Sequence, residues 1–96
     1  MSLFVVRHEH SADSCPAGDP QMGPMLLKHV SQQNASQFGV TVHGEAVLDG
    51  AHTFYLILEA ENEARVKEYM TPFAQAGSVD VWPASTCEQV VERAAC

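Results

Sequence analysis

The stretch TFYLILE at residues 53–59 decides the fold, because it is the strongest strand signal in the sequence. It is rich in aromatic and aliphatic residues and is apolar on both alternating faces, which is typical of a central strand covered on both sides. Asp49-Gly50 lies just before it and is a strong hairpin signal between two extended runs. Residues 40–48 alternate in polarity, so they are predicted to be the partner strand of this hairpin.

The rest of the chain divides into two further strands and three helical regions. Hydrophobic periodicity and the Gly and Pro residues that interrupt it set their expected limits. We predict strands over 3–10 and 78–82, a helix that opens near 19–24 and is followed by a short turn ending at Gly39, a helix over 62–77 interrupted at Thr71-Pro72, and a last helix over 85–93.

Polar residues mark the expected helix starts. Asn62 has the position and chemistry of an N-cap. Asn34 with Gln37, and Ser85 with Glu88, fit the spacing of a capping box. These three sites predict where the backbone N–H groups of the helices find their first acceptors.

The element order is β-α-β-β-α-β followed by a short helix, and it predicts an α+β, ferredoxin-like fold in a single domain over residues 1–96. Right-handed crossovers put two helices on one face of a four-stranded antiparallel sheet, with the strands in the spatial order fourth, first, third, second. The helix-free face needs a cover, and a second copy of the sheet would supply one. We therefore expect a sheet-to-sheet homodimer.

Charge and composition exclude several classes of partner. The 96 residues contain 12 Asp and Glu against 5 Lys and Arg, a formal net charge of −7. Such a surface repels phosphate backbones and anionic lipids, so we expect neither nucleic acid nor membrane as a partner. The sequence shows no targeting segment, and three cysteines are too few for a disulfide framework, so we predict a cytoplasmic protein.

His8-Glu9-His10 is the most suggestive site motif. Two residues that are two apart on a strand point to the same face, about 6.5 to 7 Å apart, so both imidazoles can reach one metal ion. Cys15 follows in the next loop and adds a thiolate. Imidazole with thiolate suits Zn, Ni or Cu better than Mg or Ca. The predicted metal ligands are therefore His8, His10 and Cys15. Metal affinity should decrease as the pH is lowered, because the ligands must lose protons to bind the ion.

Three further residues are possible members of this site. His29 lies on the apolar stripe of the first helix, where a core histidine with a satisfied ring nitrogen is the preferred interpretation. His52 opens the third strand and should lie near the end of the first. Cys87 begins the last helix at the opposite end of the sheet, so it reaches the site only if the tail crosses to a partner subunit. Met22 and Met25 are interpreted as core, and Trp82 as packing.

Two other classes of function stay open. The first is a cofactor-free enzyme or small-molecule-binding protein with a cleft between sheet and helices, in which a histidine acts as general base. The second is a structural or interaction module with no organised site. Nucleotide binding loses its usual support, because the sequence has neither G-x-G-x-x-G nor a P-loop.

Three stretches carry a resemblance to a known superfamily: LFVVRH at residues 3–8, TFYLILEA at 53–60 and PFAQAGSV at 72–79. With these stretches in this order, the chain resembles an uncharacterised branch of the dimeric α/β-barrel superfamily of small ferredoxin-like proteins. That superfamily includes cofactor-free monooxygenases, isomerases, haem-degrading enzymes and a small nickel-binding protein. The segment CPAGDP at residues 15–20 matches none of their site motifs. The resemblance therefore implies the fold and a dimer, and leaves the function open.

Overall fold

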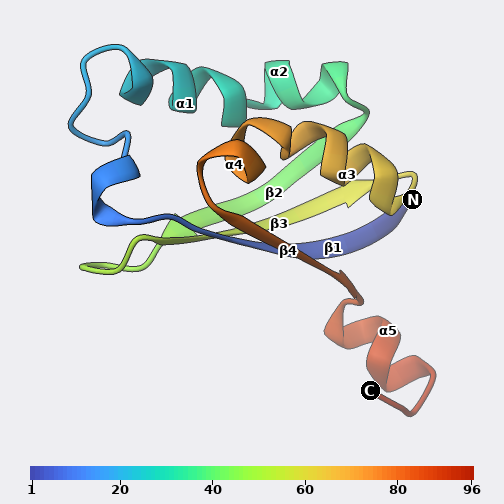
Figure 1. Cartoon of the computed structure of the whole chain (residues 1–96). Coiled ribbons are helices and arrows are strands. Elements are labelled where there is room, and N and C mark those ends of the chain that lie inside the picture. The colour runs from blue at the N-terminus through green and yellow to red at the C-terminus, as the bar shows by residue number, and fades with distance from the viewer.

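A computed structural model describes all 96 residues and shows an α+β fold built on one antiparallel sheet (Figure 1). The four strands are β1 (Ser2–Glu9), β2 (Val40–Val47), β3 (Thr53–Ala60) and β4 (Ser78–Ala84). They lie in the order β2-β3-β1-β4, and every neighbouring pair is antiparallel. The prediction of an α+β chain with a four-stranded antiparallel sheet is confirmed.

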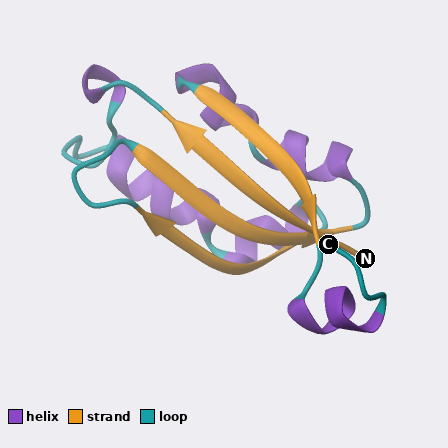
Figure 2. Ribbon diagram, turned by 90° about the horizontal axis from the view of Figure 1, so that it is seen from below, coloured by secondary structure: helices purple, strands orange, loops and turns teal.

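The helices divide between the two sides of the sheet. They are α1 (Met22–Val30), α2 (Gln32–Gln37), α3 (Glu63–Tyr69), α4 (Thr71–Ala76) and α5 (Cys87–Glu92), with a short 3-10 helix η1 (Ala12–Ser14) after β1. Figures 1 and 2 show α1 to α4 on one face and α5 on the other side, beyond the end of β4. Each of the two predicted helices on the covered face is thus a pair of short helices.

Local hydrogen bonds explain where the first helices begin. Asp19 Oδ1 accepts from the backbone N–H groups of Gln21 and Met22 at 2.8 and 2.9 Å, which starts α1. Ser31, not Asn34, caps α2: its hydroxyl accepts from the N–H of Asn34 at 3.3 Å. The expectation of a helix start at Asn34 is therefore wrong, because the serine three residues earlier already supplies the acceptor.

The later helices follow the same chemistry. Asn62 caps α3, as predicted, by accepting from the N–H of Arg65 at 3.1 Å. The capping box of α5 is formed by Thr86 and Gln89, one residue later than the predicted Ser85 and Glu88. β4 continues through Pro83 to Ala84, and Ser85 links the strand to the cap, with its hydroxyl accepting from Arg93 Nη1 at 2.9 Å.

The core lies between the sheet and helices α2, α3 and α4. Alternation along β1 turns Phe4, Val6 and His8 inward, and β3 does the same with its own alternate residues. Only 13 of 96 residues are buried, so the single chain has a thin core. Its twelve apolar members are Phe4, Val6, Ala35, Val40, Phe54, Leu56, Leu58, Ala60, Val66, Tyr69, Met70 and Phe73.

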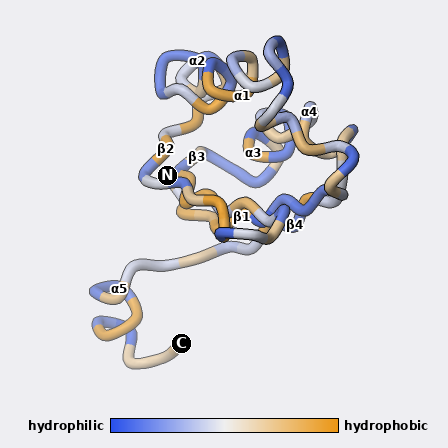
Figure 3. Tube along the Cα trace, turned by 90° about the vertical axis from the view of Figure 1, so that its left-hand side faces the viewer, coloured by the Kyte–Doolittle hydropathy of each residue, from blue (hydrophilic) through white to orange (hydrophobic).

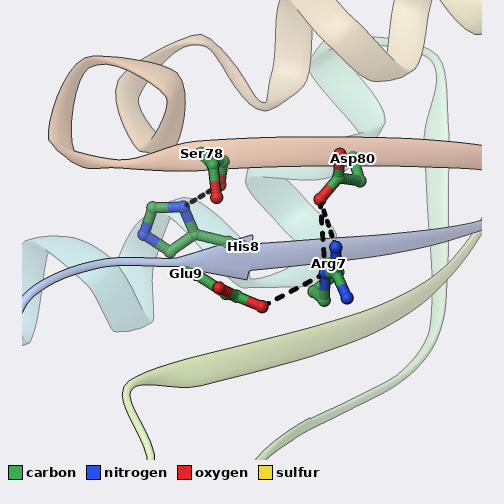
Figure 4. A network of polar contacts seen from close by, with 5 residues as sticks. All are labelled: Arg7, His8, Glu9, Ser78 and Asp80. Carbon is green, nitrogen blue, oxygen red and sulfur yellow. Dashed lines mark hydrogen bonds and ion pairs between the residues drawn. The ribbon is translucent and has the colours of Figure 1, made fainter.

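The opposite face of the sheet is open. Ile57 of β3 and Trp82 of β4 are 45% and 44% exposed, so the expectation that strand 53–59 is covered on both sides and that Trp82 is packed is not met within one chain. Arg7 crosses this face, with its guanidinium 5.2 Å from the Trp82 ring centroid and 2.9 Å from Asp80 Oδ2. The open face thus carries exposed apolar side chains beside the ion pairs of Arg7 with Asp80 and Glu9, which Figure 4 shows.

Helix α5 stands away from the rest of the domain (Figure 3). None of its residues is buried, and Val91 is 77% exposed. An isolated helix of six residues has little stability of its own in water. Neither α5 nor any other helix is long and apolar enough to cross a membrane.

Candidate functional site

Three histidines meet where β1 ends and β3 begins. His8 is the last inward residue of β1, and His10 continues the same face just beyond it. The backbone N–H of His10 donates to the carbonyl of His52 at 3.1 Å, which extends the β1–β3 pairing by one step. Ring centroids are 5.2 Å apart both for His8 and His10 and for His10 and His52. The antiparallel register thus brings a residue of the hairpin loop beside the predicted His-x-His motif.

Cys15 reaches the same place because the chain turns back immediately after β1. The N–H groups of Ser14 and Cys15 donate to the carbonyls of Ser11 and Ala12 at 3.0 and 3.3 Å, which closes the single turn of η1. Cys15 is half-buried and its thiol is free. As a result, a ligand atom from each of His10, Cys15 and His52 lies within 4.8 Å of the others.

His10 is the unusual member of this group. Both of its ring nitrogens are buried, and neither has a hydrogen-bond partner. A buried polar atom without a partner costs about 1 to 3 kcal/mol, and such atoms are rare in folded proteins. Burial, with a smaller contribution from His52, lowers the pKa of His10 below its ordinary value. The site therefore holds an imidazole with unused coordinating capacity.

His8 is held firmly, beside the group but outside it. Its Nδ1 lies 3.0 Å from the carbonyl of Ser78 (Figure 4). Because a carbonyl only accepts, Nδ1 carries the proton and Nε2 carries the lone pair. Burial lowers the pKa of His8, although the bond to Ser78 opposes the shift. In this conformation His52, rather than the predicted His8, completes the three-residue group. His8 lies next to the group, with its ring packed beside that of His10.

His29 has no free coordinating atom. Its Nε2 donates to the carbonyl of Tyr69 at 2.7 Å, and its Nδ1 lies 3.3 Å from the side-chain amide of Asn34. The ring also stacks on Tyr69 with centroids 4.9 Å apart. His29 is thus half-buried with both ring nitrogens partnered, but it lines the cavity and is not one of the buried core residues.

Cys87 lies far from the group, at the other end of the sheet. It is exposed at the start of α5, which follows the end of β4 that pairs with the beginning of β1 (Figure 1). His43 is also separate, because its Nε2 contacts Glu59 Oε1 at 2.7 Å on the open face. Within one chain, neither residue joins the cluster.

A cavity of about 290 Å³ opens directly from the His-Cys cluster. It lies between the sheet, the loop after β1, α1 and α4, and Met22 and Met25 of α1 face it while 50% and 64% exposed. The prediction that these two methionines belong to the core is wrong, because α1 has no buried residue and only Leu26 and Val30 of its apolar side chains pack against the core. The Pro and Gly residues of segment 15–24 were the sequence signal that this part of the chain forms a loop around a cavity instead of packing on the sheet.

Comparison with known proteins identifies the family. Residues 8–95 match the family model described as a domain of unknown function, DUF3303. The chain belongs to this family. No curated protein and no solved structure matches the sequence.

The cavity of this DUF3303 domain has no charged side chain. The chain carries twelve carboxylates, yet no Asp or Glu lines the cavity, and neither does any Lys or Arg. Its polar groups are those of four histidines, Ser14 and Cys15, and apolar side chains form most of the remainder. His10, Cys15 and His52 lie together, whereas His29 stacks on Tyr69. A mostly apolar lining with a few polar groups is typical of small-molecule sites.

Proposed function

We propose that this DUF3303 domain binds one transition-metal ion per chain through His10, Cys15 and His52. The observation that carries the proposal is that both ring nitrogens of His10 are buried and have no protein partner. A metal ion bound to one nitrogen gives that atom the partner it lacks. The neighbouring thiol and second imidazole complete a donor set that suits Zn, Ni or Cu.

The spacing of the three donors supports this proposal. Tetrahedral zinc with bonds of about 2.0 to 2.3 Å separates its donor atoms by roughly 3.3 to 3.6 Å. The three donors lie within 4.8 Å of one another, so closure around an ion needs shifts of about 1 Å. Cys15 follows a single helical turn and His52 lies in the hairpin loop, so both can move by this amount. His10 directly follows β1, which holds it in place.

The fold and the thiols are consistent with the rest of the proposal. A four-stranded antiparallel sheet with helices on one face is the arrangement expected of the ferredoxin-like, dimeric α/β-barrel superfamily, and we propose that the domain is a member. Cys15, Cys87 and Cys96 are all free. A thiolate ligand must stay reduced, so a cytoplasmic location belongs to the same proposal.

Zinc titration tests the metal site. We expect the untagged protein to bind one Zn²⁺ per chain in competition with a chromophoric chelator. His10→Ala and His52→Ala should each weaken binding at least about 100-fold, since even the loss of an outer hydrogen-bond partner costs about 10- to 100-fold. His43→Ala is the matched control, because His43 is exposed and lies outside the cluster.

Circular dichroism separates a lost site from a lost fold. Both cluster variants should keep the wild-type spectrum, because His10 and His52 are outside the apolar core. Equal zinc affinity in the wild type, the cluster variants and His43→Ala would refute the proposed site.

We also infer that a second copy of the chain covers the open face of the sheet. Ile57 and Trp82 expose apolar surface there, α5 projects on the same side without an intrachain partner, and the core within one chain is thin. Ile57→Lys should therefore convert a dimer into a monomer in sedimentation equilibrium, while Leu27→Lys, exposed on α1, should leave the dimer intact. A monomeric wild type would contradict this inference.

A further inference from the structure

The His-Cys cluster supplies three ligands and leaves room for a fourth. Structural zinc sites are closed by four protein ligands, whereas sites that bind or transform a small molecule keep one position open. His10, Cys15 and His52 all line the cavity, so an ion bound by them would face its apolar body. His29 does not close the site, because both of its ring nitrogens already have partners. His8 lines the same cavity, but its Nδ1 is held by the Ser78 carbonyl and it is not part of the group whose ligand atoms lie within 4.8 Å of one another.

Charge balance indicates what the fourth position takes. A divalent ion with one thiolate and two neutral imidazoles keeps one net positive charge. The cavity contains no carboxylate to neutralise it, although the chain has twelve. An uncompensated charge in apolar surroundings is costly. A monoanion at the open position removes that charge.

The apolar walls indicate the body of the same ligand. Met22, Met25 and Leu26 of α1 line the cavity, and Phe54 and Phe73 line it as well. A volume of about 290 Å³ is at the lower end of small-molecule sites, which corresponds to a ligand on the order of ten non-hydrogen atoms.

From these observations we propose that the site binds a small apolar monoanion. Its oxygen head, a carboxylate or a phenolate, takes the fourth position on the metal, and its apolar body fills the gap between α1 and the sheet. This inference rests on the proposed metal site. It adds that the organic ligand binds only when the metal is bound, because no Lys or Arg lines the cavity to hold the anion without the metal.

Cobalt-loaded protein tests the proposal with defined probes. Co²⁺ alone is titrated first, followed by hexanoate, acetate and hexan-1-ol, with visible absorption and calorimetry as readouts. We expect hexanoate to shift the cobalt bands and to bind at least about tenfold more tightly than acetate, because only hexanoate has a body that can be buried. Hexan-1-ol should leave the bands unchanged, and metal-free protein should not bind hexanoate. A parallel titration with 4-ethylphenol shows whether the preferred head is carboxylate or phenolate.

A matched pair of variants locates the ligand body. The double change Met22→Gln and Met25→Gln makes the wall polar at two exposed positions, and should weaken hexanoate binding about tenfold without changing cobalt affinity. Leu27→Gln lies on the same helix, outside the cavity lining, and should change neither value.

The outcomes distinguish the two proposals. If cobalt binds but hexanoate and acetate bind alike, or neither shifts the bands, the ligand proposal is overturned and the metal site stands. If hexanoate binds equally well to metal-free protein, the metal does not hold its head, and the proposal also fails. Absence of cobalt binding would instead overturn the metal site and this inference with it.

Discussion

Gly77→Ala is expected to lower the free energy of unfolding by about 3 kcal/mol. A Cβ atom at residue 77 would lie 2.0 Å from the carbonyl oxygen of Glu9 and 3.1 Å from the Cα of His10. Both contacts are with backbone, so no flexible side chain can move aside. Either β4 must separate from the end of β1 or α4 must shift, and both movements disturb the packing around His8.

Chemical denaturation at fixed protein concentration measures this effect. Gly18→Ala is the matched control, because a Cβ there meets nothing within 4 Å, and its change should stay within about 0.5 kcal/mol. The close approach of β4 to β1 would be refuted if the two variants unfolded alike. Since Gly77 contacts the backbone of His10, Gly77→Ala should also weaken zinc binding in whatever fraction still folds.

Cys15→Ser is expected to have the largest effect on the metal site. In Co²⁺-loaded wild-type protein, a thiolate ligand gives an intense near-ultraviolet charge-transfer band, which should disappear in this variant. Metal affinity should fall at least about 100-fold, because a hydroxyl is a poor replacement for a soft thiolate. Absorption titration measures the band and the affinity together.

Cys87→Ser is the control for this experiment, since Cys87 is exposed at the opposite end of the sheet. It should keep both the band and the affinity. The reverse result, loss with Cys87→Ser and none with Cys15→Ser, would place the thiolate on α5 and require exchange of the C-terminal helix between subunits.

Much of the fold could be predicted because local signals agree with tertiary packing. The structure has a strand where the apolar run at 53–59 predicts one, and a turn between two strands at Asp49-Gly50. It also has the predicted alternation of inward and outward side chains along β1. Pro83 misled the prediction of strand four. Proline is tolerated in β4 because this is an edge strand with one unpaired side, a property of the assembled sheet that local sequence does not show.

Part of the site was also visible in sequence. Two-residue periodicity places His8 and His10 on one face, and antiparallel pairing brings His52 beside them. Sequence spacing could not show that His8 would be committed to the carbonyl of Ser78, since this contact joins residues from opposite ends of the chain. Helical periodicity likewise could not distinguish Met25 facing a cavity from Met25 in a core, because it identifies an apolar stripe and not what lies opposite.

The most direct test of the metal site is X-ray absorption at the zinc edge on protein loaded with one equivalent of Zn²⁺. The account predicts two imidazole nitrogens at about 2.0 to 2.1 Å, one sulfur at about 2.3 Å and one further light atom. The sulfur should be lost in Cys15→Ser and retained in Cys87→Ser. A shell of oxygen and nitrogen alone in the wild-type protein would contradict the site.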